Sequence, residues 1–232
     1  MMWMKRFDML QLFYPCRCLL CGQTLLTAER YLCLHCLCDL PRTRYHKRLD
    51  NPMYKLYEGI SQIREVSAFL FFEREGAAQT LIHAIKYHGN KSLAEQLGSL
   101  ALREMKPYGL FEDMDCLIPV ALHSQRERQR GYNQAEWIAR GIASVCQRPV
   151  NCDALYRNIS TVTQTHQSFY ERHLNVEKIF GIRNPDALAG KHVLLIDDVI
   201  TTGATSIACI EALLTVPDIR ISVFALAIVP PQ

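Results

Sequence analysis

The segment Val193–Thr205 joins a short apolar run to two carboxylates and a loop rich in hydroxyl groups. Four apolar residues, 193–196, predict a buried parallel strand, and Asp197 and Asp198 follow at its carboxyl edge, where open α/β sheets bind ligands. Adjacent carboxylates repel phosphate, but they suit vicinal hydroxyls or a hydrated cation. The loop after them opens a predicted helix, and its backbone N–H groups suit a single phosphate. It consists of Thr201, Thr202, Gly203, Ala204 and Thr205.

This segment therefore predicts a sugar-phosphate site, with the anion in the loop and ribose hydroxyls at the two carboxylates. A plain capped turn between strand and helix would also use Asp and Thr, but it would not require the acidic pair and the Thr/Gly loop together. The loop lacks the lysine of a Walker motif and the glycine spacing of a dinucleotide fingerprint.

A second group of reactive side chains is a cluster of cysteines. Six of the ten cysteines fall between residues 16 and 38. In a reducing compartment, two C-x2-C pairs separated by eleven residues predict a zinc site of four thiolates, since each pair turns both sulfurs to one side. The predicted ligands are Cys18, Cys21, Cys33 and Cys36.

Three neighbours leave the choice of ligands open, because Cys16, His35 or Cys38 could replace one of the four. The module itself admits two interpretations. It is either a zinc ribbon that contacts nucleic acid, helped by basic residues at 42–48, or a metal staple for a segment too short to fold alone. The staple is the favoured interpretation.

Composition excludes several classes of protein. The chain has 232 residues, of which 49% are hydrophobic and 21% charged, with a formal net charge of +3. These values exclude a disordered chain and a strongly basic nucleic-acid binder. No apolar run approaches the roughly 18 residues of a membrane span, and the first residues do not have the pattern of a signal peptide. We therefore expect a cytoplasmic protein without a membrane span.

The elements that must position these groups follow from hydrophobic periodicity. Residues 1–45 are expected to hold an N-terminal helix and the cysteine module, 46–62 a polar linker, and 63–232 an α/β domain. Within that domain the pattern predicts strands at 66–72, 115–118, 193–196 and 221–229, and helices at 77–87, 92–105, 133–146 and 207–214. Ser92 with Glu95 is interpreted as a capping box, and Asn133 as a helix N-cap.

Residues 193–205 resemble the phosphoribosyl diphosphate (PRPP) signature of type I phosphoribosyltransferases. The other motifs, in their order, resemble the ComF/GntX family of competence proteins over about residues 10–230. These motifs are the four cysteines, Lys86-Tyr87, Pro119–His123, the run from Arg128 through Arg130, Gly131, Tyr132, Asn133 and Gln134, and the segment from Thr161, Thr163 and Gln164 through Arg172 and Asn175 to Phe180.

The resemblance implies an open parallel sheet with helices on both faces, as in type I phosphoribosyltransferases, preceded by a small zinc-ribbon-like module. It implies that Asp197 and Asp198 face the ribose and that Thr201–Thr205 hold the 5′-phosphate. The loop Val120, Ala121, Leu122 and His123 would meet the diphosphate, with Mg²⁺ bridging.

Further candidates carry competing structural interpretations. Arg128 and Arg130 would supply charge for the diphosphate or for a nucleic-acid backbone, or form a solvated basic turn. Asn133 and the adjacent Gln134 begin a helix, where Asn133 would act as a cap. Lys86 ends a helix, where its charge favours the helix dipole without any ligand.

Two functions of different classes follow. The first is Mg²⁺-dependent phosphoribosyl transfer to an unknown acceptor. The acceptor is unknown because no segment is predicted to cover a purine or pyrimidine. No side chain is recognised as a general acid or general base for the acceptor. The second, implied by the resemblance, is a competence factor that binds single-stranded DNA, works with a helicase-like partner and keeps the PRPP pocket for binding or regulation.

Overall fold

The computed structural model describes residues 16–157 and 179–230. The N-terminal helix expected before the cysteines lies outside these residues, and so do Thr161, Thr163, Gln164, Arg172 and Asn175 of the predicted motif. Phe180, at the end of that motif, is described and lies in a short strand.

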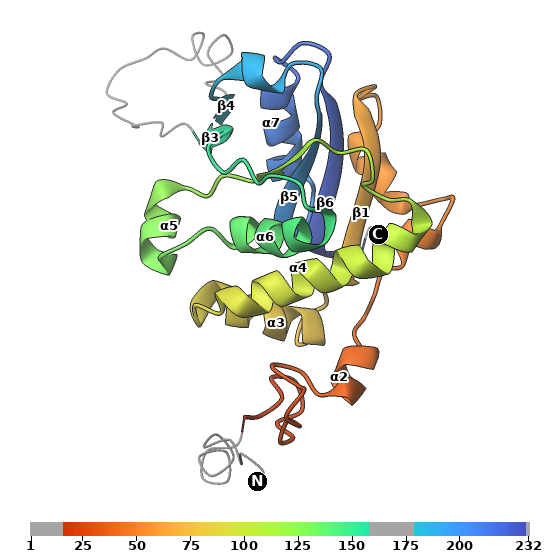
Figure 1. Cartoon of the computed structure of the whole chain (residues 1–232), viewed down its shortest axis with the longest axis vertical. Helices are drawn as coiled ribbons and strands as arrows, with labels where there is room; N and C mark the ends of the chain where they lie inside the picture. Colours follow the sequence, from red (N-terminus) through yellow and green to blue (C-terminus); the bar gives the residue numbers. More distant parts are fainter. Residues whose placement is uncertain (1–15, 158–178, 231–232) are drawn as a thin grey trace, which may run out of the picture.

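A parallel sheet of four strands forms the centre of the fold (Figure 1). Its strand order is β1-β6-β5-β2, and all three pairings are parallel. The predicted α/β class with an open parallel sheet is therefore confirmed. The strands are β1 (Ile63–Phe71), β2 (Cys116–Pro119), β5 (His192–Ile200) and β6 (Arg220–Ile228).

Helices cover both faces of this sheet because the central strands are apolar on both sides. On one face, α3 (Ala77–Tyr87), α4 (Lys91–Met105) and α6 (Gln134–Cys146) pack on residues such as Leu194 and Phe224. On the other face, α7 (Ala204–Leu213) packs on Leu195 and Val223, together with the hairpin of β3 (Leu155–Arg157) and β4 (Phe180–Ile182).

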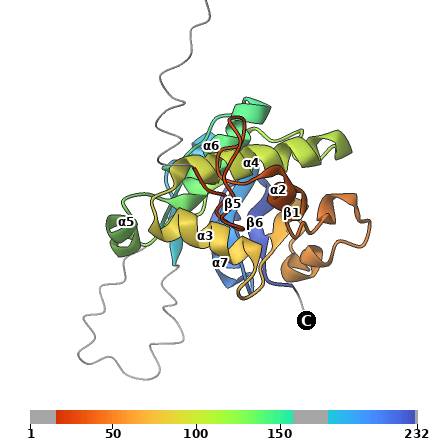
Figure 2. The same ribbon diagram turned by 90° about the horizontal axis from the view of Figure 1, so that it is seen from below.

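The cysteine module packs on the helices of the first face. Cys18, Leu32, Cys33 and Leu40 are buried in the same core cluster as the inner residues of α3 and α4. The short helix α2 (Leu34–Cys38) carries the second cysteine pair, and Figure 2 shows the module lying over these helices. The chain leaves the module at Arg42, which forms an ion pair of 2.8 Å with Glu104 of α4.

The segment after the module packs on the opposite face of the sheet. It forms two 3-10 helices, η1 (Tyr45–Lys47) and η2 (Pro52–Tyr57), and buries Tyr45, Met53 and Tyr57 in the core beneath β1 and α7. Residues 41–57 thus connect the two faces by wrapping around the edge strand β1, where Thr43 N–H donates to Phe69 O at 3.0 Å.

Two local predictions differ from the structure. The strand expected at 193–196 continues through both carboxylates to Ile200, because Asp197 and Val199 pair with Ala225 and Ala227 of β6. The capping box was wrong, since α4 begins at Lys91 after Asn90, and Ser92 lies within the first turn. The predicted cap of α6 is confirmed: Asn133 Oδ1 accepts from Ala135 N–H at 3.0 Å.

Two glycines allow α4 and α6 to cross closely. A Cβ atom on Gly98 would overlap the carbonyl oxygen of Ile138, and one on Gly141 would overlap the carbonyl oxygen of Glu95. Because the obstructing atoms are backbone, no side-chain rotation relieves the overlap. This crossing fixes α6, and with it the loops at both of its ends.

We expect Gly141→Ala to destabilise the fold by about 1–3 kcal/mol, since overpacking outweighs the gain of about 1 kcal/mol that alanine brings to a helix. Urea unfolding followed by circular dichroism measures the difference. Ser144→Ala, on the exposed side of α6, is the matched control and should change stability little. A Gly141→Ala variant more stable than the wild type would contradict the close crossing.

Candidate functional site

The two predicted carboxylates lie in the carboxyl-terminal half of the central strand β5, before Val199 and Ile200. Asp198 N–H donates to Asp197 Oδ1 at 2.8 Å, so the pair is locally ordered. Burial, followed by the charge of Asp198, raises the pKa of Asp197 to about 7. At neutral pH Asp197 is therefore protonated part of the time, and the pair can accept a cation or hydroxyl donors.

Lys86 supplies a cation to this pair. Its Nζ lies 2.9 Å from Asp198 Oδ2, and both side chains are mostly buried, at 20% and 15% exposure. Lys86 is the penultimate residue of α3, so the end of that helix meets the end of β5. The structure thus places it at the acidic pair, which the helix-dipole interpretation did not predict.

The threonine-rich loop follows β5 and begins α7. Thr201, Thr202, Ala204 and Thr205 are exposed, whereas Gly203 is buried at the N-cap of the helix. Gly203 has φ +80°, which a side chain adopts only with strain. The loop thus combines exposed threonines with the start of a ten-residue helix, where phosphate is favoured, and Ala204 N–H donates to Thr202 Oγ1 at 3.5 Å.

Buried hydrogen bonds connect this loop to Tyr57 in the core. Ser206 O–H donates to Gly203 O at 2.8 Å, and Tyr57 Oη lies 2.9 Å from Ser206 Oγ. Burial raises the pKa of Tyr57 to about 12, so the phenol keeps its proton. Residues 52–57 therefore hold the loop in position, although no sequence pattern predicted them to lie here. Tyr57 lies far from the loop 201–205 in the chain, so no sequence pattern links the two.

The predicted diphosphate loop begins beside β5. Val120 N–H donates to Ile196 O at 2.8 Å, and Val120 is buried, whereas Ala121, Leu122 and His123 are half-buried. Nδ1 of His123 accepts from Gln125 N–H at 3.2 Å and caps α5 (Ser124–Arg130). Asn133 Nδ2 donates to Val120 O at 3.0 Å, so Asn133 holds this loop as well as capping α6.

The basic turn after α5 reaches toward the end of α3. Arg130 donates to Gln134 Oε1 at 2.9 Å, and its guanidinium lies 5.5 Å from the ring centroid of Tyr87. Gln134 is buried and is bound to Arg130 and to Tyr132 O, which leaves it a positioning role. Tyr132 is buried and donates to Ile85 O, which fixes the turn against α3. Arg128 is exposed.

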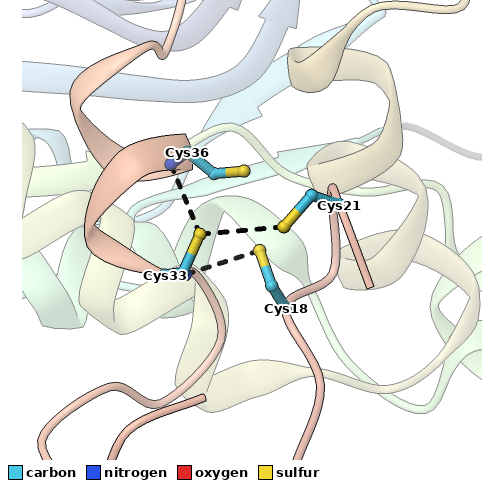
Figure 3. Close-up of side chains that lie close together, drawn as sticks. All are labelled: Cys18, Cys21, Cys33 and Cys36. Atoms are coloured by element: carbon cyan, nitrogen blue, oxygen red, sulfur yellow. Dashed lines mark hydrogen bonds between the residues drawn. The ribbon is translucent and has the colours of Figure 1, made fainter. Parts of the chain in front are cut away.

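The four predicted cysteines form a compact cluster at the far side of α3 and α4 (Figure 3). Their sulfurs all lie within 4.8 Å of one another, and Sγ of Cys21 is 3.7 Å from Sγ of Cys33. A tetrahedron with Zn–S bonds of about 2.3 Å has edges of about 3.8 Å, so this donor set fits zinc. Cys16 and Cys38 are exposed, and neither belongs to the cluster.

The protein environment favours negative charge on one of these thiols. Burial alone would raise the pKa of Cys18, but hydrogen bonds from backbone N–H groups, including that of Cys33 at 3.4 Å, lower it to about 6. Burial and neighbouring thiols raise the pKa of Cys36. His35 Nδ1 instead lies 3.2 Å from Asp39 Oδ2, so the histidine in the second pair has another partner.

Comparisons with known proteins give relatives in several bacteria. The chain is 30% identical to the DNA utilization protein YhgH of Escherichia coli over 129 residues, 54% of this chain and 56% of that protein. It is 27% identical to competence protein F of Haemophilus influenzae over 83% of this chain and 88% of that protein. It is 35% identical to competence protein ComFC of Bacillus subtilis over 38% and 34%.

The chain thus matches little more than half the length of the YhgH proteins. No protein-family model matches it. Similar solved structures include glutamine PRPP amidotransferase from Bacillus subtilis, with a TM-score of 0.41, 19% identity and coverage of 57% of this chain and 26% of that one. Another is adenine phosphoribosyltransferase from Saccharomyces cerevisiae, with a TM-score of 0.37, 16% identity and coverage of 62% and 71%.

Within the described residues, no helix is both long and apolar enough to cross a membrane. The motifs that resembled the ComF family agree with the relatives found by comparison, and the predicted four-cysteine cluster is present. The chain is similar to competence protein F of Haemophilus influenzae over most of its length and to competence protein ComFC of Bacillus subtilis over part of it.

Proposed function

We propose that the protein binds PRPP or a related ribose phosphate, with Mg²⁺, at the carboxyl end of β5. The observation that carries this proposal is the meeting of three groups there: the acidic pair, Lys86 and the exposed loop 201–205. The loop lies at a helix N-terminus, where backbone N–H groups favour phosphate, and the carboxylates suit the ribose hydroxyls. Carboxylate and diphosphate oxygens are the ligands that Mg²⁺ prefers, so the site fits that ion.

The chemistry proposed at this site is transfer of the phosphoribosyl group. The bond between the anomeric carbon and the diphosphate breaks while a bond to the acceptor forms, and the diphosphate leaves with the electron pair. Mg²⁺ would neutralise part of the leaving charge. Lys86, beside the acidic pair, and Arg130, at the turn opposite α3, are the basic side chains placed to add to that neutralisation.

We expect Asp197→Asn and Asp198→Asn each to weaken PRPP binding about tenfold or more, because a hydrogen bond to a charged group contributes about 1.5–3 kcal/mol. Titration calorimetry with PRPP and Mg²⁺ measures this effect. Asp218→Asn is the matched control, because Asp218 is exposed and precedes the amino end of β6, at the edge of the sheet opposite the site. Wild-type protein that does not bind PRPP, or variants that bind as well as wild type, would refute the site.

Diphosphate release separates transfer from binding alone. We propose transfer as the function of this site, and release that depends on an added nucleobase or other acceptor would support it. Binding of PRPP without release for any acceptor would favour the second candidate, in which the pocket senses PRPP in a DNA-handling protein. That candidate is supported by relatives named for competence and DNA utilization.

In that role we propose that the protein acts in the cytoplasm on single-stranded DNA, together with a helicase-like partner. A net charge of +3 is too small for binding by overall charge, so the contact must use local basic residues. The candidates for this contact are basic clusters at 42–48, 126–130 and 172–178. Residues 42–48 and the backbone of 126–130 fall within the described ranges, whereas 172–178 lies outside them.

The raised pKa of Asp197 gives the site a pH dependence. A carboxyl with a pKa of about 7 is mostly protonated at pH 6 and mostly ionised at pH 8, so binding that needs the carboxylate should strengthen over this range. Calorimetry at several pH values tests this. Lys86→Met should move the midpoint upward, because the ammonium group lowers the pKa of Asp197. Unchanged affinity between pH 6 and pH 8 would contradict the assignment.

We propose that the four cysteines hold a structural zinc ion. Because the module has few large apolar residues of its own, the metal would stabilise it, and its packing on α3 and α4 would pass that stability to the domain. The alternative role of the zinc-bound module is to contact nucleic acid as a zinc ribbon.

We expect Cys36→Ser to reduce zinc toward zero per chain, measured by plasma mass spectrometry after dialysis, because three thiolates hold the ion far less tightly. Cys16→Ser and Cys38→Ser are matched controls and should keep one zinc per chain, since both thiols lie outside the cluster. Loss of zinc from either control with retention in Cys36→Ser would show a different set of ligands.

A further inference from the structure

A basic hollow lies where the segment after the cysteine module meets the carboxyl end of α4. Its volume is about 530 Å³, and its walls come from residues 38–47 and 103–108. None of these residues belongs to the proposed ribose-phosphate site. We call it the Arg44 pocket, after the arginine that lines it together with Lys47 and Arg103.

The charges of the Arg44 pocket are unbalanced. Its one carboxylate, Glu104, is bound by Arg42 at 2.8 Å, and Arg42 also donates to Leu37 O at 2.9 Å. Arg44, Lys47 and Arg103 remain exposed, and no carboxylate in the described part of the chain forms an ion pair with them. Three cations around one hollow attract an anion with several negative oxygens.

A buried polar atom in the same wall has no partner. Nδ1 of His46 is fully covered and makes no hydrogen bond with any described residue. Burial, then the charge of Lys47, lowers the pKa of His46, so the ring is neutral at pH 7 and carries one N–H donor. Because this atom is covered by the protein, a ligand in the hollow would meet the exposed cations of the wall and not Nδ1 of His46.

An aromatic ring completes the pocket. Tyr108 is half exposed, and Nζ of Lys47 lies 4.9 Å from its ring centroid. The ring of His46 packs against it at 5.0 Å between centroids. A phosphate that drew Lys47 away would free one face of Tyr108, on which a base stacks well.

We propose that the Arg44 pocket binds nucleotide phosphate, with the attached base on Tyr108. The phosphate meets Arg44, Lys47 and Arg103, and the base replaces Lys47 on the ring. The same chemistry is presented by a segment of single strand and by a free nucleotide. This is a second ligand site, separate from the proposed PRPP site and independent of it.

The test uses the full chain, a fluorescent oligothymidylate of about twelve nucleotides, and anisotropy over a salt series. Arg44→Gln/Arg103→Gln should weaken binding tenfold or more at low salt. Because a single strand releases about 0.7 counterion per phosphate contact, the slope of log K against log salt should fall by about 1.4 in magnitude. Arg74→Gln/Arg148→Gln removes the same charge from exposed positions elsewhere and should change affinity less than threefold.

Equal losses in the two double variants would overturn the proposal, because they would show an effect of overall charge. Absence of binding by the wild type to the oligonucleotide and to thymidine monophosphate would also overturn it. Asp197→Asn/Asp198→Asn should bind the oligonucleotide like wild type, so failure of the PRPP site leaves this result unaffected.

Competition identifies the source of the phosphate. A free nucleotide is the ligand if thymidine monophosphate displaces the oligonucleotide at equal nucleotide concentration, and a strand is the ligand if displacement needs over a hundredfold more. Tyr108→Leu should weaken binding of either about tenfold, whereas Tyr108→Phe should not. Deoxyribose 5-phosphate competing as well as thymidine monophosphate would overturn the stacking of the base.

Discussion

Asp197 and Asp198 place two carboxylates close together near the end of a buried central strand, and the free energy of their charge must be compensated. The other groups of the site provide this compensation. Burial raises the free energy of a charged carboxylate, and a second charge beside it raises that energy further. The raised pKa of Asp197 keeps that carboxyl protonated part of the time, and the ammonium of Lys86 lies 2.9 Å from Asp198. A ligand that brings Mg²⁺ and ribose hydroxyls would offer the pair further compensation for its charge.

The surrounding elements hold that edge of the sheet in place from several directions. The crossing of α4 and α6 at Gly98 and Gly141 sets the position of α6, and its N-cap Asn133 holds the loop after β2. On the opposite face, Tyr57 supports Gly203 through Ser206. The cysteine module packs on α3, the helix that carries Lys86, so a zinc ion in the module would stiffen the site from a distance.

Much of this arrangement could be predicted from sequence because it depends on local patterns. The ends of α3 and the cap of α6 follow from periodicity and Asn133, and the cysteine cluster follows from its spacing. The contact between Lys86 and Asp198 joins residues that lie far apart in the chain, and the same holds for Tyr57 and Ser206. No local pattern encodes such pairs. The strand β5 was predicted too short because carboxylates are poor strand formers, yet pairing with β6 keeps them in the sheet.

The state of the acidic pair is the most direct test of this account. Carbon-13 NMR of the aspartate carboxyl groups, titrated between pH 4 and pH 9, reports the apparent pKa values of the pair with and without PRPP and Mg²⁺. We predict a midpoint of about 7 in the free protein that belongs to Asp197 and falls when the ligand binds. An ordinary midpoint near 4, or one that the ligand does not change, would contradict it.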